Sequence, residues 1–155
     1  MLAKEVMDTQ FRTLSPGTSI LDAVQLFRSE SERSGRKVFG MMVTDPKDRL
    51  VGMVSMYDIL LLVRPKHIHI WGEMSDIEVS GYMEKTCHRV RPILVGDIMT
   101  TDVITVTPAT HILMVLDVMI KKHVRRVPVV EKGRILGVVY ISDIFYHLMD
   151  CIGAG

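Results

Sequence analysis

Two aspartates follow the same kind of apolar segment at two places in the chain. Residues 52–60 read GMVSMYDIL and residues 137–145 read GVVYISDIF, so that Asp58 corresponds to Asp143 at an offset of 85. A carboxylate at the start of a helix, just beyond a strand, can accept hydrogen bonds from both vicinal hydroxyls of a ribose. Aspartate also caps helices, so capping stays open as the alternative role of both residues.

Hydroxyl and cationic side chains close to the aspartates suit the other parts of a nucleotide. Ser55 and Ser142 can contact a ribose or a phosphate, and residues 121–126 read KKHVRR, which includes Arg125 and Arg126. Arginine binds phosphate well because its planar guanidinium donates two hydrogen bonds at once. A solvated helix end is the alternative interpretation of this run, since basic residues complement a helix C-terminus.

The part of the chain around the first aspartate, Asp58, lacks this arginine pair. Phe39 and Gly40 stand at the positions aligned with Arg125 and Arg126, although residues 36–37 read RK nearby. The phosphate-binding function is therefore predicted for the second segment.

The hydroxyl beside each aspartate differs as well. Tyr140 stands where the first segment has Ser55, and its ring can stack on a base or block access. The Asp143 site thus has the basic residues and a bulky neighbour, whereas the Asp58 site has the small hydroxyl. We expect one nucleotide per chain, or two sites of unequal affinity.

Both aspartates belong to an internal duplication of the sequence. Residues 5–27 match residues 97–119 at an offset of 92, and residues 40–60 match residues 126–145 at an offset of 85 from Gly52 onward. The difference between the offsets, 92 and 85, means that the first half carries seven more residues, mostly around RSESERSGRK. Two copies indicate a duplicated domain, because a solenoid needs at least three repeats.

Each half is predicted to form a β-α-β-β-α unit. A short strand, FRTL or VITV, precedes a helix whose N-cap is predicted at Thr18 or Thr110. A hairpin follows around TDPKDR or EKGR, and then a second helix opens at the aspartate. One copy is too small to bury both helix faces, so the predicted fold class is α/β of the α+β type, with two units related by a pseudo-twofold axis.

The duplicated unit resembles a tandem pair of CBS (cystathionine-β-synthase-type) domains. The resemblance rests on Asp-Ile-Met-Thr before the first strand, Thr-Pro before the helix, RRVPVVEKGRILGVV through the hairpin, and Asp-Ile in the last helix. It implies a first CBS unit over 1–63, a connecting segment with a helix over 64–95, and a second unit over 96–152. It further implies a disc-like module with two clefts between the halves.

The resemblance also implies a function. Such modules bind adenosyl compounds, so we expect a regulatory module that senses adenine nucleotides (AMP, ADP or ATP) as ligands, with no cofactor. An S-adenosylmethionine-binding module and a ligand-free dimeric interaction scaffold are the alternatives. A homodimer and an unidentified effector protein are the expected protein partners.

Residue by residue, the resemblance assigns roles around the two aspartates. Thr9 should face the Asp143 site and Thr101 the Asp58 site. Val138 and the equivalent Met53 are expected to sandwich the adenine. Packing in the core is the alternative role of these two apolar residues. The predicted ligand-binding residues are Asp143, Ser142, Tyr140, Val138, Arg125, Arg126, Thr9, Asp58, Ser55, Met53 and Thr101.

Composition sets broad limits on the class of protein. Hydrophobic residues make up 48% of the 155, which predicts a sizeable core, and the formal net charge of +1 gives no case for a nucleic-acid or membrane partner. The sequence shows neither a secretory signal nor an apolar run of the roughly 20 residues that a membrane helix needs. With two cysteines in no recognised spacing, a cytoplasmic protein is expected.

The middle segment raises a metal question and the whole chain raises a catalytic one. The spacing of the possible zinc ligands, His67, His69, Cys87 and His88, is not standard for a structural zinc site, so a metal-responsive protein is a third hypothesis. Trp71 is predicted to pack at a dimer face. The sequence contains no phosphate-binding loop of the G-x-x-x-x-G-K type, no G-x-G-x-x-G, no H-E-x-x-H and no G-x-S-x-G. The chain is therefore predicted not to be an enzyme.

Overall fold

The chain folds into two compact units, each built from separate stretches of sequence. The computed structural model describes residues 1–65 and 76–154, and the side chains of residues 76–80 are outside this description. Unit 1 contains Met1–Arg12, Pro46–Leu50 and Asp102–Gly155, and unit 2 contains Thr13–Asp45 and Val51–Thr101.

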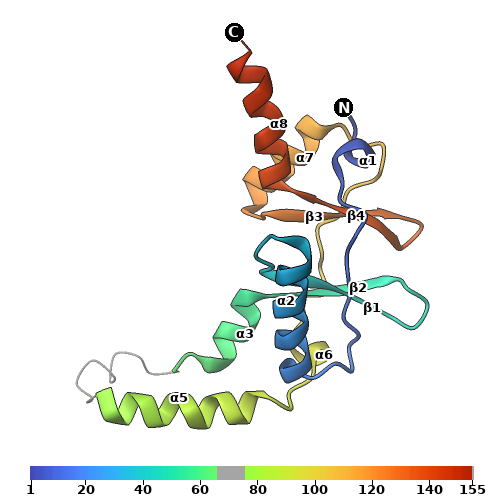
Figure 1. Cartoon of the computed structure of the whole chain (residues 1–155). Coiled ribbons are helices and arrows are strands. Elements are labelled where there is room, and N and C mark those ends of the chain that lie inside the picture. The colour runs from blue at the N-terminus through green and yellow to red at the C-terminus, as the bar shows by residue number, and fades with distance from the viewer. Residues whose placement is uncertain (66–75, 155) are drawn as a thin grey trace. The chain divides into compact units, whose positions relative to one another are not determined.

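Unit 1 is built on a β-hairpin flanked by helices (Figure 1). Its elements are α1 (Ala3–Val6), α7 (Ile112–Lys122), β3 (Arg126–Glu131), β4 (Arg134–Tyr140) and α8 (Ile141–Gly153). Strands β3 and β4 are antiparallel, and their register places Arg126 opposite Tyr140. This register brings the start of β3 next to the point where β4 runs into α8.

Unit 2 repeats this plan and adds a helix from the middle segment. Its elements are α2 (Ile20–Ser34), β1 (Gly40–Thr44), β2 (Leu50–Ser55), α3 (Met56–Val63), α5 (Asp76–Val90) and α6 (Val95–Ile98). The hairpins, the two longer helices of each repeat, the helix of the middle segment and the mixed α+β class are as predicted, whereas the short helices α1 and α6 were not expected. The predicted first strands are shorter than expected, since each reduces to a single parallel bridge, Leu14 to Val43 and Val106 to Val129.

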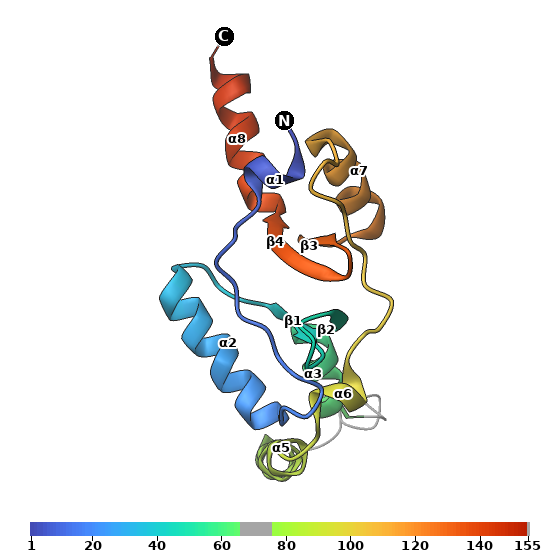
Figure 2. The same ribbon diagram turned by 90° about the vertical axis from the view of Figure 1, so that its right-hand side faces the viewer.

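A short helix is exchanged between the two sequence repeats. Helix α1 begins the first repeat but lies with β3, β4 and α7 in unit 1, and α6 begins the second repeat but lies with α2 and the β1–β2 hairpin in unit 2 (Figures 1 and 2). Ala3 donates a backbone hydrogen bond to Thr110 at 2.8 Å, and Val95 donates the equivalent one to Thr18 at 2.8 Å. Ala3 and Val95 are both 0% exposed. Each unit is therefore completed by a segment from the other repeat.

Each unit has its own apolar core. The core of unit 1 consists of Ala3, Val106, Ile112, Val115, Met119, Val127, Val129, Val139 and Ile144. The core of unit 2 consists of Leu14, Ile20, Ala23, Met41, Val43, Val54, Val90 and Val95. The burial of these side chains fixes the hairpins and hence the strand-to-helix junctions that carry the two aspartates.

The N-caps of α2 and α7 lie one residue beyond Thr18 and Thr110, so these two predictions are wrong. The Thr18 hydroxyl instead accepts a hydrogen bond from the Ser15 amide at 3.2 Å and closes a turn before the helix. Ser19 caps α2 and His111 caps α7. A hydroxyl that is already used in a turn leaves the capping role to the next residue.

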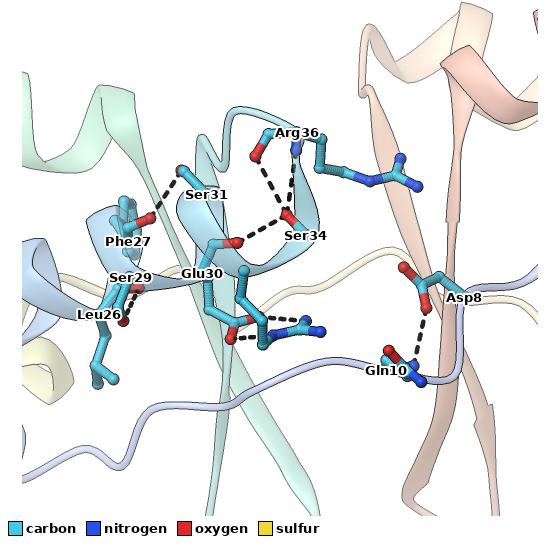
Figure 3. Close-up of polar contacts among 10 residues, drawn as sticks. Asp8, Gln10, Leu26, Phe27, Ser29, Glu30, Ser31, Ser34 and Arg36 are labelled. Carbon is cyan, nitrogen blue, oxygen red and sulfur yellow. Dashed lines mark hydrogen bonds and ion pairs between the residues drawn. The ribbon is translucent and has the colours of Figure 1, made fainter.

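The extra residues of the first repeat lengthen α2 and stabilise its end (Figure 3). Helix α2 has 15 residues and α7 has 11. The Ser34 hydroxyl donates to the Glu30 carbonyl at 2.7 Å and accepts from the Arg36 amide at 3.3 Å. Arg33 forms a two-pronged ion pair with Glu30, both bonds at 2.8 Å, and Gly35 ends the helix at a φ of 71°. The insertion thus forms an ordered helix end just before Phe39.

Candidate ligand-binding site

The strand-to-helix junctions of the two units have the same backbone geometry. The first residue of α8, Ile141, donates a hydrogen bond to the Arg125 carbonyl at 2.9 Å, and the first residue of α3, Met56, donates to the Phe39 carbonyl at 2.7 Å. Phe39 and Arg125 are therefore structurally equivalent, as the sequence alignment predicts. Each junction brings the start of one strand next to the helix turn that carries the aspartate.

Cationic side chains gather at the junction of unit 1. Arg126 lies opposite Tyr140 and is half-buried, and Arg125 beside it is exposed. Burial lowers the pKa of Arg126 below its ordinary value; Tyr140 opposes this shift and the positive charge of Arg125 adds to it. Because an arginine titrates far above neutral pH, the guanidinium stays charged. This junction is therefore suited to an anion.

The segment around Thr9 lies along β4 in the same unit as Asp143. Asp8 forms an antiparallel bridge with Val138, with amide-to-carbonyl distances of 2.8 and 2.9 Å. The Asp8 carboxylate also accepts from the Gln10 amide at 2.8 Å, which turns the chain at Thr9 (Figure 3). Thr9 is exposed, whereas Val138 is only 2% exposed, which fits the core-packing alternative for Val138.

Asp143 lies in the first turn of α8. The helix N-cap is Tyr140, whose side chain makes no capping hydrogen bond. Asp143 is half-buried and Ser142 is exposed. The two candidate ribose-binding residues, Ser142 and Asp143, thus follow Tyr140, which pairs with Arg126 in the hairpin.

The junction of unit 2 forms a closed capping box. Ser55 donates to the Asp58 Oδ2 atom from its amide at 2.8 Å and from its hydroxyl at 3.1 Å, and the Asp58 amide donates to the Ser55 hydroxyl at 3.4 Å. These bonds satisfy backbone groups at the start of α3. Capping, the alternative role of Asp58, is therefore present in the structure, and a ribose would have to share or replace these bonds.

The segment around Thr101 is placed in unit 2 as Thr9 is placed in unit 1. Met53 on β2 pairs with Thr100, with both amide-to-carbonyl distances at 2.9 Å. Met53 is half-buried and Thr101 is exposed. Asp8 and Thr100, which hold the two segments in place, were not among the predicted residues; their position next to the aligned threonines was the available signal.

The metal hypothesis concerns residues of the middle segment. His67, His69 and Trp71 lie outside the described residues, while Cys87 and His88 are exposed on α5. Across residues 1–65 and 76–154, no group of three or more His, Cys, Asp or Glu side chains is arranged to hold a metal ion. Over the same residues, no helix has the length and apolar character needed to cross a membrane.

Two known proteins are similar in sequence to most of the chain. The chain is 25% identical over 162 residues to the uncharacterized protein MJ1426 of Methanocaldococcus jannaschii, with 96% of this chain and 92% of that protein covered. It is 27% identical over 133 residues to the CBS domain-containing protein CBSX2 of Arabidopsis thaliana, a chloroplastic protein, with 81% of this chain covered. The match spans only 53% of the CBSX2 sequence.

Solved structures share the fold. The structure of CBSX2 in complex with AMP superimposes with a TM-score of 0.71 at 26% identity and covers 96% of this chain and 97% of that chain. The CBS domain pair of MJ0100, in complex with 5-methylthioadenosine and S-adenosyl-L-methionine, has a TM-score of 0.67 at 19% identity and covers 96% and 95% of the two chains.

The two repeats themselves match one protein family. The CBS domain model matches residues 3–65 and 95–150, which together make up well over half of the chain. Both matched stretches contain a hairpin, a strand-to-helix junction and its aspartate, in the order that the structure shows. The chain is therefore a member of the CBS domain family, with a tandem pair of CBS domains.

Proposed function

We propose that this chain is a regulatory module that binds adenine nucleotides, AMP, ADP or ATP, at its strand-to-helix junctions. The observation that carries the proposal is the junction of unit 1. There Arg126 pairs with Tyr140 and the Arg125 carbonyl accepts from the Ile141 amide, next to the helix turn of Asp143. The structure of CBSX2 with AMP, 26% identical over most of the chain, supports the choice of ligand.

Each group at the junction has a role in this proposal. The Asp143 carboxylate accepts hydrogen bonds from the two ribose hydroxyls, and the arginines bind the phosphate through charge-assisted hydrogen bonds. Ser142 and Thr9, both exposed, supply hydroxyls at the edge of the site. In unit 2, Asp58, Ser55, Met53 and Thr101 form the corresponding set.

Binding is the proposed activity, and the module has no catalytic role of its own. A ligand that binds one conformation more tightly than another shifts the population towards it, and a separate effector protein reads the change. Both described cysteines are free and exposed, which suits a reducing compartment such as the cytoplasm.

A dimeric assembly is part of the proposal and also the basis of the second candidate function. On α8, Phe145 is 58% exposed, Tyr146 66% and Ile152 79%. On α3, Leu60 and Leu61 are exposed as well, at the positions that correspond to Phe145 and Tyr146 in the repeat. Such apolar faces are typical of interfaces, so a second copy is proposed to cover them. A ligand-free dimeric scaffold would use the same faces.

The alternative ligand is S-adenosylmethionine. It shares the adenosine group, and its sulfonium carries a positive charge where a nucleotide carries phosphate. Arg125 and Arg126 would repel that charge in unit 1, so the arginine pair favours the nucleotide.

A melting-temperature screen tests the proposal. AMP, ADP, ATP and S-adenosylmethionine are added separately, and a nucleotide at about 100 times its Kd should stabilise the protein by about 2.7 kcal/mol. Asp143→Asn should reduce the shift. Asp150→Asn is the matched control, because it removes an exposed carboxylate from the same helix. The proposal would be contradicted if none of the adenosyl compounds raised the melting temperature. It would also be contradicted if the rise stayed the same in both Asp143→Asn and Asp58→Asn.

A further inference from the structure

The two junctions share a backbone geometry but differ in charge. The carbonyls of Arg125 and Phe39 accept equivalent hydrogen bonds from the first residues of α8 and α3. The next residue is Arg126 in unit 1 and Gly40 in unit 2. Unit 1 therefore has two arginines at its junction, whereas unit 2 has a phenylalanine and a glycine at the equivalent positions.

The arginine pair of unit 1 is not neutralised by carboxylates. Across residues 1–65 and 76–154, neither guanidinium forms an ion pair with an acidic side chain. Arg126 is half-buried, and like charges on Arg125 and Arg126 disfavour each other. An arrangement of this kind is stabilised when an anion with several oxygen acceptors binds, as a phosphate does.

The junction of unit 2 offers hydrogen-bonding groups, and it has Phe39 and Gly40 at the positions of the arginine pair. Ser55 and Asp58 are held together by bonds of 2.8 and 3.1 Å, and these groups can exchange partners with ligand hydroxyls. The basic residues closest to Phe39 in the sequence are Arg36 and Lys37, at the end of the α2 insertion. The Arg36 backbone is bonded to Ser34 there, so the insertion and not the strand start carries this charge.

We propose that the two sites differ in ligand class, with unit 1 requiring a phosphate and unit 2 taking an adenosyl compound without one. The inference rests on the proposed function, because it assigns ligands to the same two junctions. Unit 1 thus binds a nucleoside phosphate such as AMP, and unit 2 binds an uncharged nucleoside such as adenosine. One chain can then report on a phosphorylated and an unphosphorylated adenosyl compound at once.

Isothermal titration with two probes, AMP and adenosine, tests the assignment on the full chain. Asp143→Asn should weaken AMP binding and leave adenosine binding unchanged, and Asp58→Asn should do the reverse. The double variant R125Q/R126Q should weaken AMP binding about tenfold or more, because it removes the charge-assisted hydrogen bonds to the phosphate, and it should leave adenosine binding unchanged. R36Q/K37Q removes the same charge from unit 2 and serves as the matched control, with unchanged AMP affinity. Melting curves establish that each variant is folded.

The possible outcomes separate the inference from the function on which it rests. If neither probe nor any other adenosyl compound binds the wild-type chain, both fail. If AMP binds and R125Q/R126Q leaves its affinity unchanged, or if one aspartate variant weakens both probes equally, the ligand-class assignment is overturned and adenosyl binding stands. If R36Q/K37Q weakens AMP as much as R125Q/R126Q does, the phosphate is bound elsewhere and the assignment is also overturned.

Discussion

Met7 packs directly against Gly137, although the two residues belong to different sequence repeats. A Cβ atom at Gly137 would lie 2.8 Å from the Met7 sulfur and 2.9 Å from the Asp8 carbonyl oxygen. The second pair repeats the relationship, since a Cβ at Gly52 would lie 2.6 Å from the Met99 sulfur. The exchanged segments thus approach the strands closely enough that only glycine fits.

Gly137→Ala should destabilise unit 1. The Asp8 carbonyl accepts from the Val138 amide at 2.9 Å and cannot withdraw without losing that bond. Overpacking of this kind costs about 1–3 kcal/mol of unfolding free energy, measurable by urea denaturation. Gly81→Ala is the control, because nothing lies within 4 Å of its Cβ position in α5, and it should stabilise by roughly 0.5–1 kcal/mol. Equal stability of Gly137→Ala and the wild type would disprove the close packing.

Ala3→Asp should disturb the second repeat more than the first. Ala3 is fully buried in the core of unit 1, and a carboxylate there would lose its hydration without gaining a partner. Hydrogen exchange should therefore accelerate in β3 and β4 while β1 keeps its protection. Lys4→Asp introduces the same side chain at an exposed neighbouring position and should change little. Faster exchange confined to β1 would show that the helix exchange is absent in solution.

Arg126→Met should stabilise the ligand-free protein while weakening nucleotide binding. The pKa of Arg126 is lowered chiefly by burial, so the folded state disfavours the charged form. When burial lowers the pKa of a cation, the folded state is destabilised at every pH below the pKa of the folded form. This destabilisation disappears only as the pH rises through that pKa, well beyond neutral pH. The melting temperature of the ligand-free variant should therefore rise at neutral pH and show no new pH dependence there. Arg125→Met, at an exposed position, should change the melting temperature less; a lower value for Arg126→Met would contradict the burial cost.

Ile152→Glu should separate the proposed dimer. Ile152 is 79% exposed on the apolar face of α8, and a buried charge at an interface of two copies is strongly unfavourable. Light scattering after size-exclusion chromatography should show the wild type at twice the chain mass and the variant at the chain mass. His147→Glu places the same charge at another exposed position of the helix and should remain dimeric. A wild-type chain that elutes as a monomer would remove the dimer from the proposal.

Local patterns in the sequence predict much of the fold because they act over short distances. The alternation of apolar residues predicts the two hairpins, and the Ser-x-x-Asp spacing predicts the cap formed by Ser55 and Asp58. The repeat correctly aligns Phe39 with Arg125. The choice of N-cap failed at Thr18, because adjacent hydroxyl residues compete and the preceding turn decides between them.

By itself, the sequence determined the duplication, the element order and the two unequal sets of polar residues, since these depend on residue type and spacing. Only the tertiary structure decided which exchanged segment completes which unit. The segments after α1 and α6 carry the same Met-x-Thr pattern, which does not distinguish one hairpin from the other, and only the family resemblance paired Thr9 with Asp143. The burial of Ala3 in one core and Val95 in the other, together with the bridge from Asp8 to Val138, makes this choice, because long-range packing depends on complementary shape that no local pattern records.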